Sequence, residues 1–261
     1  MQTETMPRLM NQPPQQAQLS WASQYRLLLR LLITDYRSAG PFLLLIGLVL
    51  PLGFMWILKQ YVGTGPDATW MLAGNIVMAI SFGSVSFAIQ RTALMKVEGE
   101  LDYYGSLSVH KSSFLAALFT ESIVFALPAM LSSMLFGHLL LDIPLLDLAS
   151  GVPIALLAAA SMTIVGSTIG SYAKTMVHFA IYSYLPYLAV TFFSPVLLPI
   201  EKLPVFLQFT SYLLPTGQAA LALNEIFEHS YGLRLWSLVA ALCLWLIFAV
   251  ALALKKLDWR T

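Results

Sequence analysis

Long apolar runs separated by short polar segments dominate the pattern of this chain. The runs fall at roughly 39–58, 70–90, 113–135, 151–171, 176–198 and 233–254. Each has the length of about 20 residues with which an α-helix crosses a hydrocarbon core of about 30 Å. The pattern therefore predicts an all-α integral membrane protein whose six transmembrane helices occupy residues 38–261.

The segment before the first run has two parts. Residues 1–19 are polar and lack the basic start and apolar run of a signal peptide, so we expect a flexible cytoplasmic tail. Residues 20–37 have a helical pattern in which one side holds Trp21, Tyr25, Leu28, Leu32 and Tyr36 and the other holds Arg26, Arg30 and Arg37. We predict an amphipathic helix at the membrane interface, with its rings at headgroup depth and its arginines toward anionic lipid. A helix packed on a soluble partner is the alternative.

Residues 199–228, between the fifth and sixth runs, form an unusual connection. They are too apolar for an exposed loop, and Pro199, Pro204 and Pro215 interrupt them too often for a single span. We predict a re-entrant pair of short helices on the outer side of the membrane, with its non-helical backbone shielded by protein.

Composition and charge agree with this topology. Hydrophobic residues make up 58% of the chain and charged residues 10%, against about a quarter charged in soluble domains. With both termini inside, eleven of the 14 Lys and Arg residues lie on the inner side, and Lys59, Lys202 and Arg234 lie outside. By the positive-inside rule we expect both termini and residues 91–112 in the cytoplasm, and the chain in the inner (plasma) membrane.

The sequence lacks the motifs of an enzyme. It contains no G-x-x-x-x-G-K-[ST] stretch, so any ATP must be bound by another chain. The four histidines are scattered, and the single cysteine, Cys243, has no partner, which disfavours a metal site and a disulfide. We therefore expect no catalytic residue, no metal, no cofactor bound by this chain and no nucleic-acid partner.

Polar and aromatic groups inside the apolar runs are the candidates for a translocation path. Glu121 is the one carboxylate well inside a run, and intramembrane ionisable groups are costly and often functional. A structural role for Glu121 near the cytoplasmic side is equally open. In the fifth run, polar side chains spaced 3, 4 and 3 apart share one face, which either lines a cavity or interface or packs in the core. The path residues that we predict are Asn75, Phe82, Glu121, Tyr184, Tyr187, Thr191 and Ser194.

Small residues recur four positions apart in the fourth run, at Gly166 and Gly170. Such a pair lets two helix backbones approach closely. Close packing within one subunit and dimerisation explain this spacing equally well.

Two connections carry a resemblance to a known family. The chain has, before its last run, Ser194, Pro199, Leu203, Pro204, Leu207, Pro215 and Thr216. Residues 91–112 contain Glu98, Gly99, Leu101 and Lys111. With these spacings, the six runs and the amphipathic helix, nearly the whole chain resembles the ABC-2 type permease family, the membrane subunits of type 2 ABC exporters. It departs from the family pattern at Leu107, Pro195, Leu214 and Asn224, where proline, glycine, asparagine and arginine are usual.

The resemblance implies a permease subunit of an ATP-driven exporter, in which two permease copies work with two copies of a separate ABC ATPase subunit. ATP and Mg²⁺ would bind to the ATPase, and membrane lipid would surround the permease. Residues 91–112 would couple the two proteins, with Gly99 turning the chain and two tyrosines as the apolar anchor. The implied coupling residues are Glu98, Gly99, Glu100, Leu101, Asp102, Tyr103 and Tyr104. A plain solvated charge run is the alternative.

The substrate and the competing classes follow from weaker signals. Aromatic side chains suit an amphipathic substrate such as a drug, an antibiotic or a lipid-like molecule, and a polysaccharide or glycolipid is the second choice. A secondary transporter would favour internal repeats and several intramembrane charges, whereas the chain shows no clear repeat and essentially one such charge, Glu121. A membrane-embedded enzyme would need a convergent acid, base or metal group, which the scattered histidines do not offer.

Overall fold

The computed structural model describes residues 19–35, 40–60, 66–107, 109–193 and 200–256, and all regular structure within them is helical. The predicted all-α class is therefore confirmed. The predicted cytoplasmic tail lies outside these residues, apart from Leu19.

Within these ranges, four helical stretches are long and apolar enough to cross a membrane: Asp67–Val97, Lys111–Leu141, Leu145–Gly170 and Leu233–Lys255. The first consists of α3 (Pro66–Ile80), the π-helical turn η1 (Ser81–Ser86) and α4 (Phe87–Val97). The others are α6 (Lys111–Leu141), α7 (Leu145–Gly170) and α11 (Leu233–Lys256). These stretches indicate a membrane protein.

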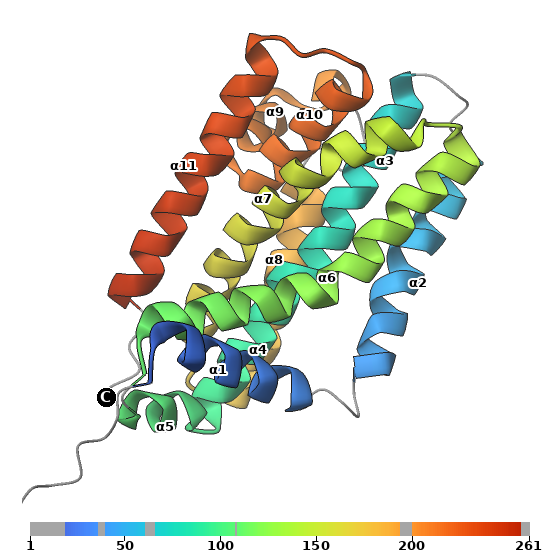
Figure 1. The fold of residues 1–261 in the computed structure, drawn as a ribbon. Helices are drawn as coiled ribbons and strands as arrows, with labels where there is room; N and C mark the ends of the chain where they lie inside the picture. Colours follow the sequence, from blue (N-terminus) through green and yellow to red (C-terminus); the bar gives the residue numbers. More distant parts are fainter. Residues whose placement is uncertain (1–18, 36–39, 61–65, 108, 194–199, 257–261) are drawn as a thin grey trace, which may run out of the picture.

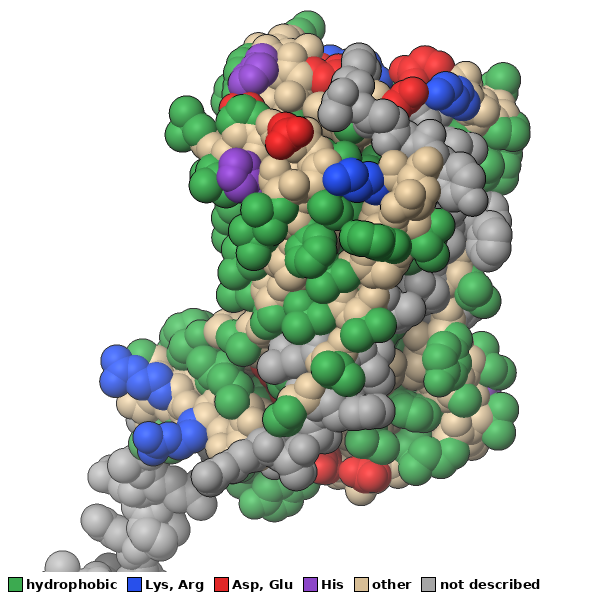
Figure 2. Space-filling model, turned by 90° about the vertical axis from the view of Figure 1, so that its right-hand side faces the viewer, with side chains coloured by type: hydrophobic (Ala, Val, Ile, Leu, Met, Phe, Trp, Pro, Cys, Tyr) green, Lys and Arg blue, Asp and Glu red, His purple; other side chains and the backbone are tan. Residues whose placement is uncertain are grey.

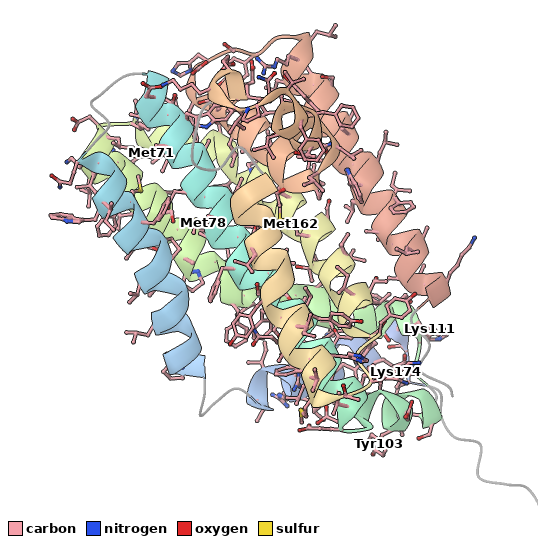
Figure 3. All side chains as sticks on the ribbon, turned by 180° about the vertical axis from the view of Figure 1, so that it is seen from behind. Met71, Met78, Tyr103, Lys111, Met162 and Lys174 are labelled. Carbon is pink, nitrogen blue, oxygen red and sulfur yellow. The ribbon has the colours of Figure 1, made fainter. Side chains whose placement is uncertain are left out.

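Two further helices coincide with the first and fifth predicted spans. They are α2 (Gly40–Lys59) and α8 (Met176–Phe193). In Figures 1 and 3 both run along the bundle between its two ends. Neither belongs to the four stretches above, so the count of six spans stays a prediction.

The short helices gather at the two ends of the bundle, which we call the lower and upper ends as drawn in Figure 1. The lower end carries α1 (Trp21–Asp35) and α5 (Glu100–Ser106). The upper end carries α9 (Val205–Leu213) and α10 (Pro215–Phe227), and the short turn η2 (Ile200–Lys202) precedes them. The predicted pair of short helices in 199–228 is confirmed, while its insertion into a membrane stays a prediction.

Proline and glycine fold α9 tightly onto α10. Leu214 is extended, and Pro215 follows at the first position of α10, where a helix needs no backbone N–H. A side chain on Gly217 would overlap the backbone of Ser211. Every residue of α10 except Glu225 is buried. This short helix is therefore part of the core and not a surface loop.

An apolar middle separates two charged ends. In the face shown in Figure 2, hydrophobic side chains cover the middle of the molecule, and Lys, Arg, Asp and Glu gather above and below it. The main core lies between α3, α6, α7, α10 and α11. Figure 3 shows Met71 and Met78 of α3 and Met162 of α7 inside the bundle, where each is at most 6% exposed. This distribution of side chains fits a protein surrounded by lipid at its middle.

Glycines bring α7 and α6 close to the first long stretch. A Cβ atom on Gly166 would lie 2.8 Å from the carbonyl oxygen of Val85, and one on Gly170 would lie 2.6 Å from that of Ile89. On the other side, a Cβ on Gly83 would lie 2.6 Å from the Cα of Ala126 in α6. The pair Gly166 and Gly170 therefore serves packing within one subunit, which decides between the two explanations of that spacing.

Candidate functional site

The connection between α4 and α6 turns at Gly99 and then forms α5. Gly99 has a backbone φ of 79°, in the left-handed region that glycine adopts without steric cost. Just before it, the Glu98 N–H donates to the carbonyl oxygen of Leu94 at 2.9 Å and closes α4. The turn that the sequence predicted at Gly99 is confirmed, and it points α5 away from the axis of α4.

Leu101 and Tyr104 hold α5 against the rest of the chain. They are 0% and 6% exposed. They belong to a group of buried side chains that we call the lower cluster: Leu28, Leu32, Met95, Leu101, Tyr104, Phe114, Ala117 and Leu118. The rings of Tyr104 and Phe114 lie 5.4 Å apart. Because its ring is already covered, Tyr104 has no surface to offer a partner, and the predicted two-tyrosine anchor reduces to Tyr103.

Tyr103 and the acidic residues beside it form the exposed side of α5. Tyr103 is 64% exposed, and Figure 3 shows its side chain at the lower end of the molecule. Asp102 pairs with Lys96, with Nζ 3.3 Å from Oδ1, and Glu98 is exposed while Glu100 is half-buried. An aromatic ring with acidic residues close to it in the sequence is therefore accessible to another molecule, and exposed rings of this kind often serve as interface anchors.

The first helix, α1, packs on the beginning of α6. Gln24 is 4% exposed, and its Oε1 accepts hydrogen bonds from the His110 backbone N–H at 3.0 Å and the Ser113 hydroxyl at 3.2 Å. These bonds satisfy polar groups at the start of a helix, which have no partner within it. Farther along, the hydroxyls of Tyr25 and Thr120 lie 2.9 Å apart. The four elements of the lower end, α1, α4, α5 and α6, thus form one packed unit.

This packing shows what covers the apolar side of the predicted amphipathic helix, while its place at the membrane interface stays a prediction. Leu28 and Leu32, on the face predicted to meet lipid headgroups, are buried in the lower cluster, while Trp21 stays 47% exposed. Tyr36 lies outside the described residues. The reason is length: α6 has 31 residues and is about 46 Å long, more than a hydrocarbon core of about 30 Å requires. Its first turns therefore offer α1 a protein surface.

Two opposite charges meet inside the bundle above the lower cluster. The Nε of Arg91 in α4 lies 3.7 Å from Oε1 of Glu121 in α6, and the side chains are 6% and 0% exposed. Ion pairs buried this deeply are tolerated because each charge compensates the other, and removing one partner is strongly destabilising. Glu121 is therefore not the lone intramembrane acid that the sequence indicated, and its pairing favours a structural role that links α4 to α6.

Sequence reasoning missed Arg91 as a site residue. It assigned Arg91 to the cytoplasmic loop because a positive charge follows an apolar run there. The helix instead continues to Val97, which leaves Arg91 six residues inside it, or about 9 Å from its end. The apolar residues that continue on both sides of Arg91 were the available signal, because a buried arginine needs an acidic partner.

Asn75 and Phe82, predicted for the translocation path, lie within the bundle. Asn75 is 1% exposed, and its Nδ2 donates to the carbonyl oxygen of Pro51 at 2.8 Å, which ties α3 to α2. Phe82 is half-buried in η1. Asn75 therefore contributes to the packing of α3 on α2, and the path role of both residues stays a prediction.

Tyr184 of α8 has the opposite environment, because 70% of it is exposed. It therefore does not line a cavity inside this subunit, and the interface that the sequence offered as an alternative stays open. The side chains of Tyr187 and Thr191, and the whole of Ser194, lie outside the described residues.

The described residues contain no group of three or more His, Cys, Asp or Glu placed to hold a metal ion. Comparison with models of protein families and with the sequences of curated proteins finds no match to this chain. In the lower cluster, α5 packs against side chains of α4 and α6, and its Tyr103 ring remains accessible.

Proposed function

We propose that this chain is the permease subunit of an ATP-driven exporter of the ABC-2 type, and that α5 receives the push of a separate ATPase. One observation supports this most directly: α5 is held to the long helices by Leu101 and Tyr104 while Tyr103 beside them remains exposed. A partner that binds differently in its two nucleotide states shifts the permease only through such a differential contact. Movement of α5 would reach Met95 of α4 and Phe114 of α6 through the lower cluster.

In the proposed assembly, two copies of this chain meet two copies of the ATPase, which binds ATP and Mg²⁺. Each copy has six spans, with α2 and α8 as the first and fifth, and both termini are cytoplasmic. The position of α1 at the lower end is consistent with this, since α1 carries Arg26 and Arg30 and no Lys or Arg lies between Val97 and His110 to favour the other end. The lower end of the bundle would then be the cytoplasmic one.

The translocation path in this proposal lies between the two copies. The exposed Tyr184 on α8 suits such a position, since an aromatic ring with a hydroxyl contacts both apolar and polar parts of a substrate. An amphipathic small molecule, meaning a drug, an antibiotic or a lipid-like compound, is the substrate class we propose. A polysaccharide or glycolipid is the alternative.

Changing Tyr103 to alanine tests the coupling role. We expect Tyr103→Ala to weaken binding of the ATPase by about 30-fold or more, the equivalent of about 2 kcal/mol, because interfaces concentrate energy in such anchors. The chain should still fold, since the ring makes little contact with its own core. The measurement is the amount of a P-loop ATPase that co-purifies with the tagged chain from its native membranes.

Tyr231→Ala is the matched control, because Tyr231 is 56% exposed near the upper end and should not contact the ATPase. If no P-loop ATPase co-purifies with the unchanged chain, the exporter proposal is wrong. If the ATPase co-purifies equally with the unchanged chain, Tyr103→Ala and Tyr231→Ala, the exporter proposal stands, but α5 does not contact the ATPase.

A secondary transporter is the second candidate, and the buried pair of Arg91 and Glu121 is the observation that favours it. Such transporters carry intramembrane charges near their coupling sites. Uptake into proteoliposomes of the chain alone distinguishes the two. Transport driven by an ion gradient without any ATPase would favour the secondary transporter.

A further inference from the structure

A polar pocket of about 240 Å³ opens at the upper end, far from the lower cluster. Its walls come from α3, η2, α10 and α11, and from Glu228 just after α10. Four elements that are distant in the sequence therefore converge on it. Figure 2 shows acidic and basic side chains gathered at this end of the molecule.

Two polar side chains in the pocket wall lack partners. The Nε1 of Trp70 and the Oδ1 of Asn224 have no hydrogen-bond partner among the described residues, although the two side chains are only 6% and 8% exposed. Burying an unsatisfied donor or acceptor costs about 1–3 kcal/mol, so such groups call for an explanation. One group donates and the other accepts, and both atoms are covered by protein, so a ligand that does the reverse would satisfy both once the two side chains turn toward the pocket.

The charge of the pocket indicates the sign of that ligand. Both cations in the wall are already paired: Lys202 Nζ lies 3.3 Å from Asp67 Oδ1, and Arg234 Nη1 lies 3.0 Å from Glu225 Oε1. Two further carboxylates of the wall, Glu201 and Glu228, have no such cation among the described residues. Within the same residues, the side chain of Glu228 accepts a long hydrogen bond, at 3.4 Å, from the Thr69 hydroxyl. The pocket therefore has a surplus of negative charge and of hydrogen-bond acceptors.

A metal ion is not the expected ligand of this negatively charged pocket. The described residues hold no group of three or more His, Cys, Asp or Glu side chains close enough together to bind the same ion. An ammonium group fits better, since its three N–H donors can reach separated acceptors. The indole N–H of Trp70 needs an acceptor, such as a hydroxyl oxygen, on the same ligand.

We infer that this pocket binds a small hydroxylated primary amine, with the ammonium toward Glu201, Glu228 and Asn224 and the hydroxyl oxygen toward Trp70. The shared chemistry is found in free amino alcohols and amino sugars and in the ethanolamine headgroup of lipids. The inference does not depend on the exporter proposal, because every residue that supports it lies at the opposite end from α5.

Binding is tested by titrating the purified full-length chain, in a detergent without a sugar headgroup, with ethanolamine and with glucosamine. Isothermal titration calorimetry should detect both amines, while glucose, which lacks the ammonium, and choline, which lacks its N–H donors, should bind at least about tenfold more weakly. Equal binding of glucose or choline, or displacement of the amine by millimolar Ca²⁺ or Mg²⁺, would overturn the inference. So would the absence of any amine binding.

Conservative variants locate the site. Glu228→Gln should weaken amine binding about tenfold, and Trp70→Phe should abolish the preference for hydroxylated amines over ethylamine. Asp142→Asn, a carboxylate outside the pocket wall, and Trp236→Phe, an exposed tryptophan, are the matched controls. The thermal midpoint of each variant shows that it is folded. If the folded pocket variants bind like the controls, the site lies elsewhere and the inference is wrong.

A second comparison shows whether the natural amine is a lipid headgroup or a soluble molecule. Nanodiscs that contain phosphatidylethanolamine in place of phosphatidylcholine should prevent ethanolamine binding if the natural ligand is a lipid headgroup. If ethanolamine binds equally in both, the ligand is a soluble molecule, and either result supports an amine site.

Discussion

At the lower end of the bundle, the opposite charges of Arg91 and Glu121 are buried and the ring of Tyr103 is exposed. At the upper end, the pair of Lys202 and Asp67 is 59% and 61% exposed. The other charge pairs there, Arg234 with Glu225 and His229 with Asp147, each keep one partner about half exposed or more. The lower end therefore buries both members of an ion pair, whereas the upper end leaves at least one member of each pair exposed to solvent.

The buried pair at the lower end and the exposed pair at the upper end differ in how strictly they fix the helices that carry them. A buried ion pair fixes the relative position of α4 and α6, because any displacement leaves a charge uncompensated in a low-dielectric interior. The pair of Lys202 and Asp67, which is exposed on both sides, contributes only about 0–1 kcal/mol and rearranges easily. The buried pair suits the coupling role proposed for the lower end, and the exposed pair suits the ligand site proposed for the upper end.

The strongest test of the comparison is whether the two ends lie on opposite sides of the membrane. In a Cys243→Ser background, Ser106→Cys at the lower end should resist an impermeant thiol reagent on intact cells, and Ser230→Cys near the upper end should react fully. The expected difference is all or none, because the reagent cannot cross the bilayer. Labelling of both positions, or of position 106 alone, would contradict the proposed topology.

The next largest effect concerns the buried pair. Glu121→Leu should destabilise the protein by about 3–5 kcal/mol, because it leaves the arginine charge buried without its partner. The double change Arg91→Leu with Glu121→Leu should recover much of this loss, and Glu121→Gln should fall between. Thermal midpoints in detergent give the order, and a double variant as unstable as Glu121→Leu would show that the pair itself does not account for the loss.

A smaller effect is expected where α7 touches α4. Gly170→Ala places a methyl group 2.6 Å from the carbonyl oxygen of Ile89, and such overpacking costs about 1–3 kcal/mol. Gly53→Ala in α2 is the control, because nothing lies within 4 Å of its added methyl group. That change should be neutral or slightly stabilising. Equal thermal midpoints for the two variants would mean that α7 can move away from α4, and that the lower end is less rigid than we infer.

The smallest expected effect is the loss of stability when one tyrosine hydroxyl is removed at each end. Tyr25→Phe removes a part-buried hydrogen bond of 2.9 Å to Thr120 and should cost about 0.5–1.5 kcal/mol. Tyr212→Phe removes an exposed bond of 3.2 Å from Arg234 and should cost close to nothing. Denaturant midpoints measure both, and the reverse order would remove the distinction between a rigid and an adaptable end.

Much of the fold could be predicted because its causes are local. Each apolar run became a helix, and the prolines of 199–228 correctly indicated two short helices in place of one long one. Gly99 was predicted to turn the chain, since few other residues adopt a positive φ readily. These features depend on residues within a few positions of each other.

The candidate site could be predicted only in part because its causes are distant. Tyr103 and Tyr104 are adjacent, and which of them is buried depends on Leu28 and Leu32, which lie more than seventy residues earlier. The partnership of Arg91 with Glu121 depends on how α4 packs against α6. Periodicity identifies the apolar face of one helix, but it does not identify the helix that covers it.

The π-helical turn Ser81–Ser86 has a consequence for the angular phase of the first long stretch. A turn with i→i+5 hydrogen bonds holds one residue more than an α-helical turn needs. Each residue of an α-helix advances the side chains by about 100° around its axis. If the same six residues were α-helical, Trp70 would be rotated relative to Arg91 by about that angle, whereas deleting one residue from the turn would leave the two in nearly the same relative orientation. The extra residue in Ser81–Ser86 therefore sets the angle between the two ends of this helix. It directs Trp70 to the wall of the upper pocket and Arg91 to Glu121.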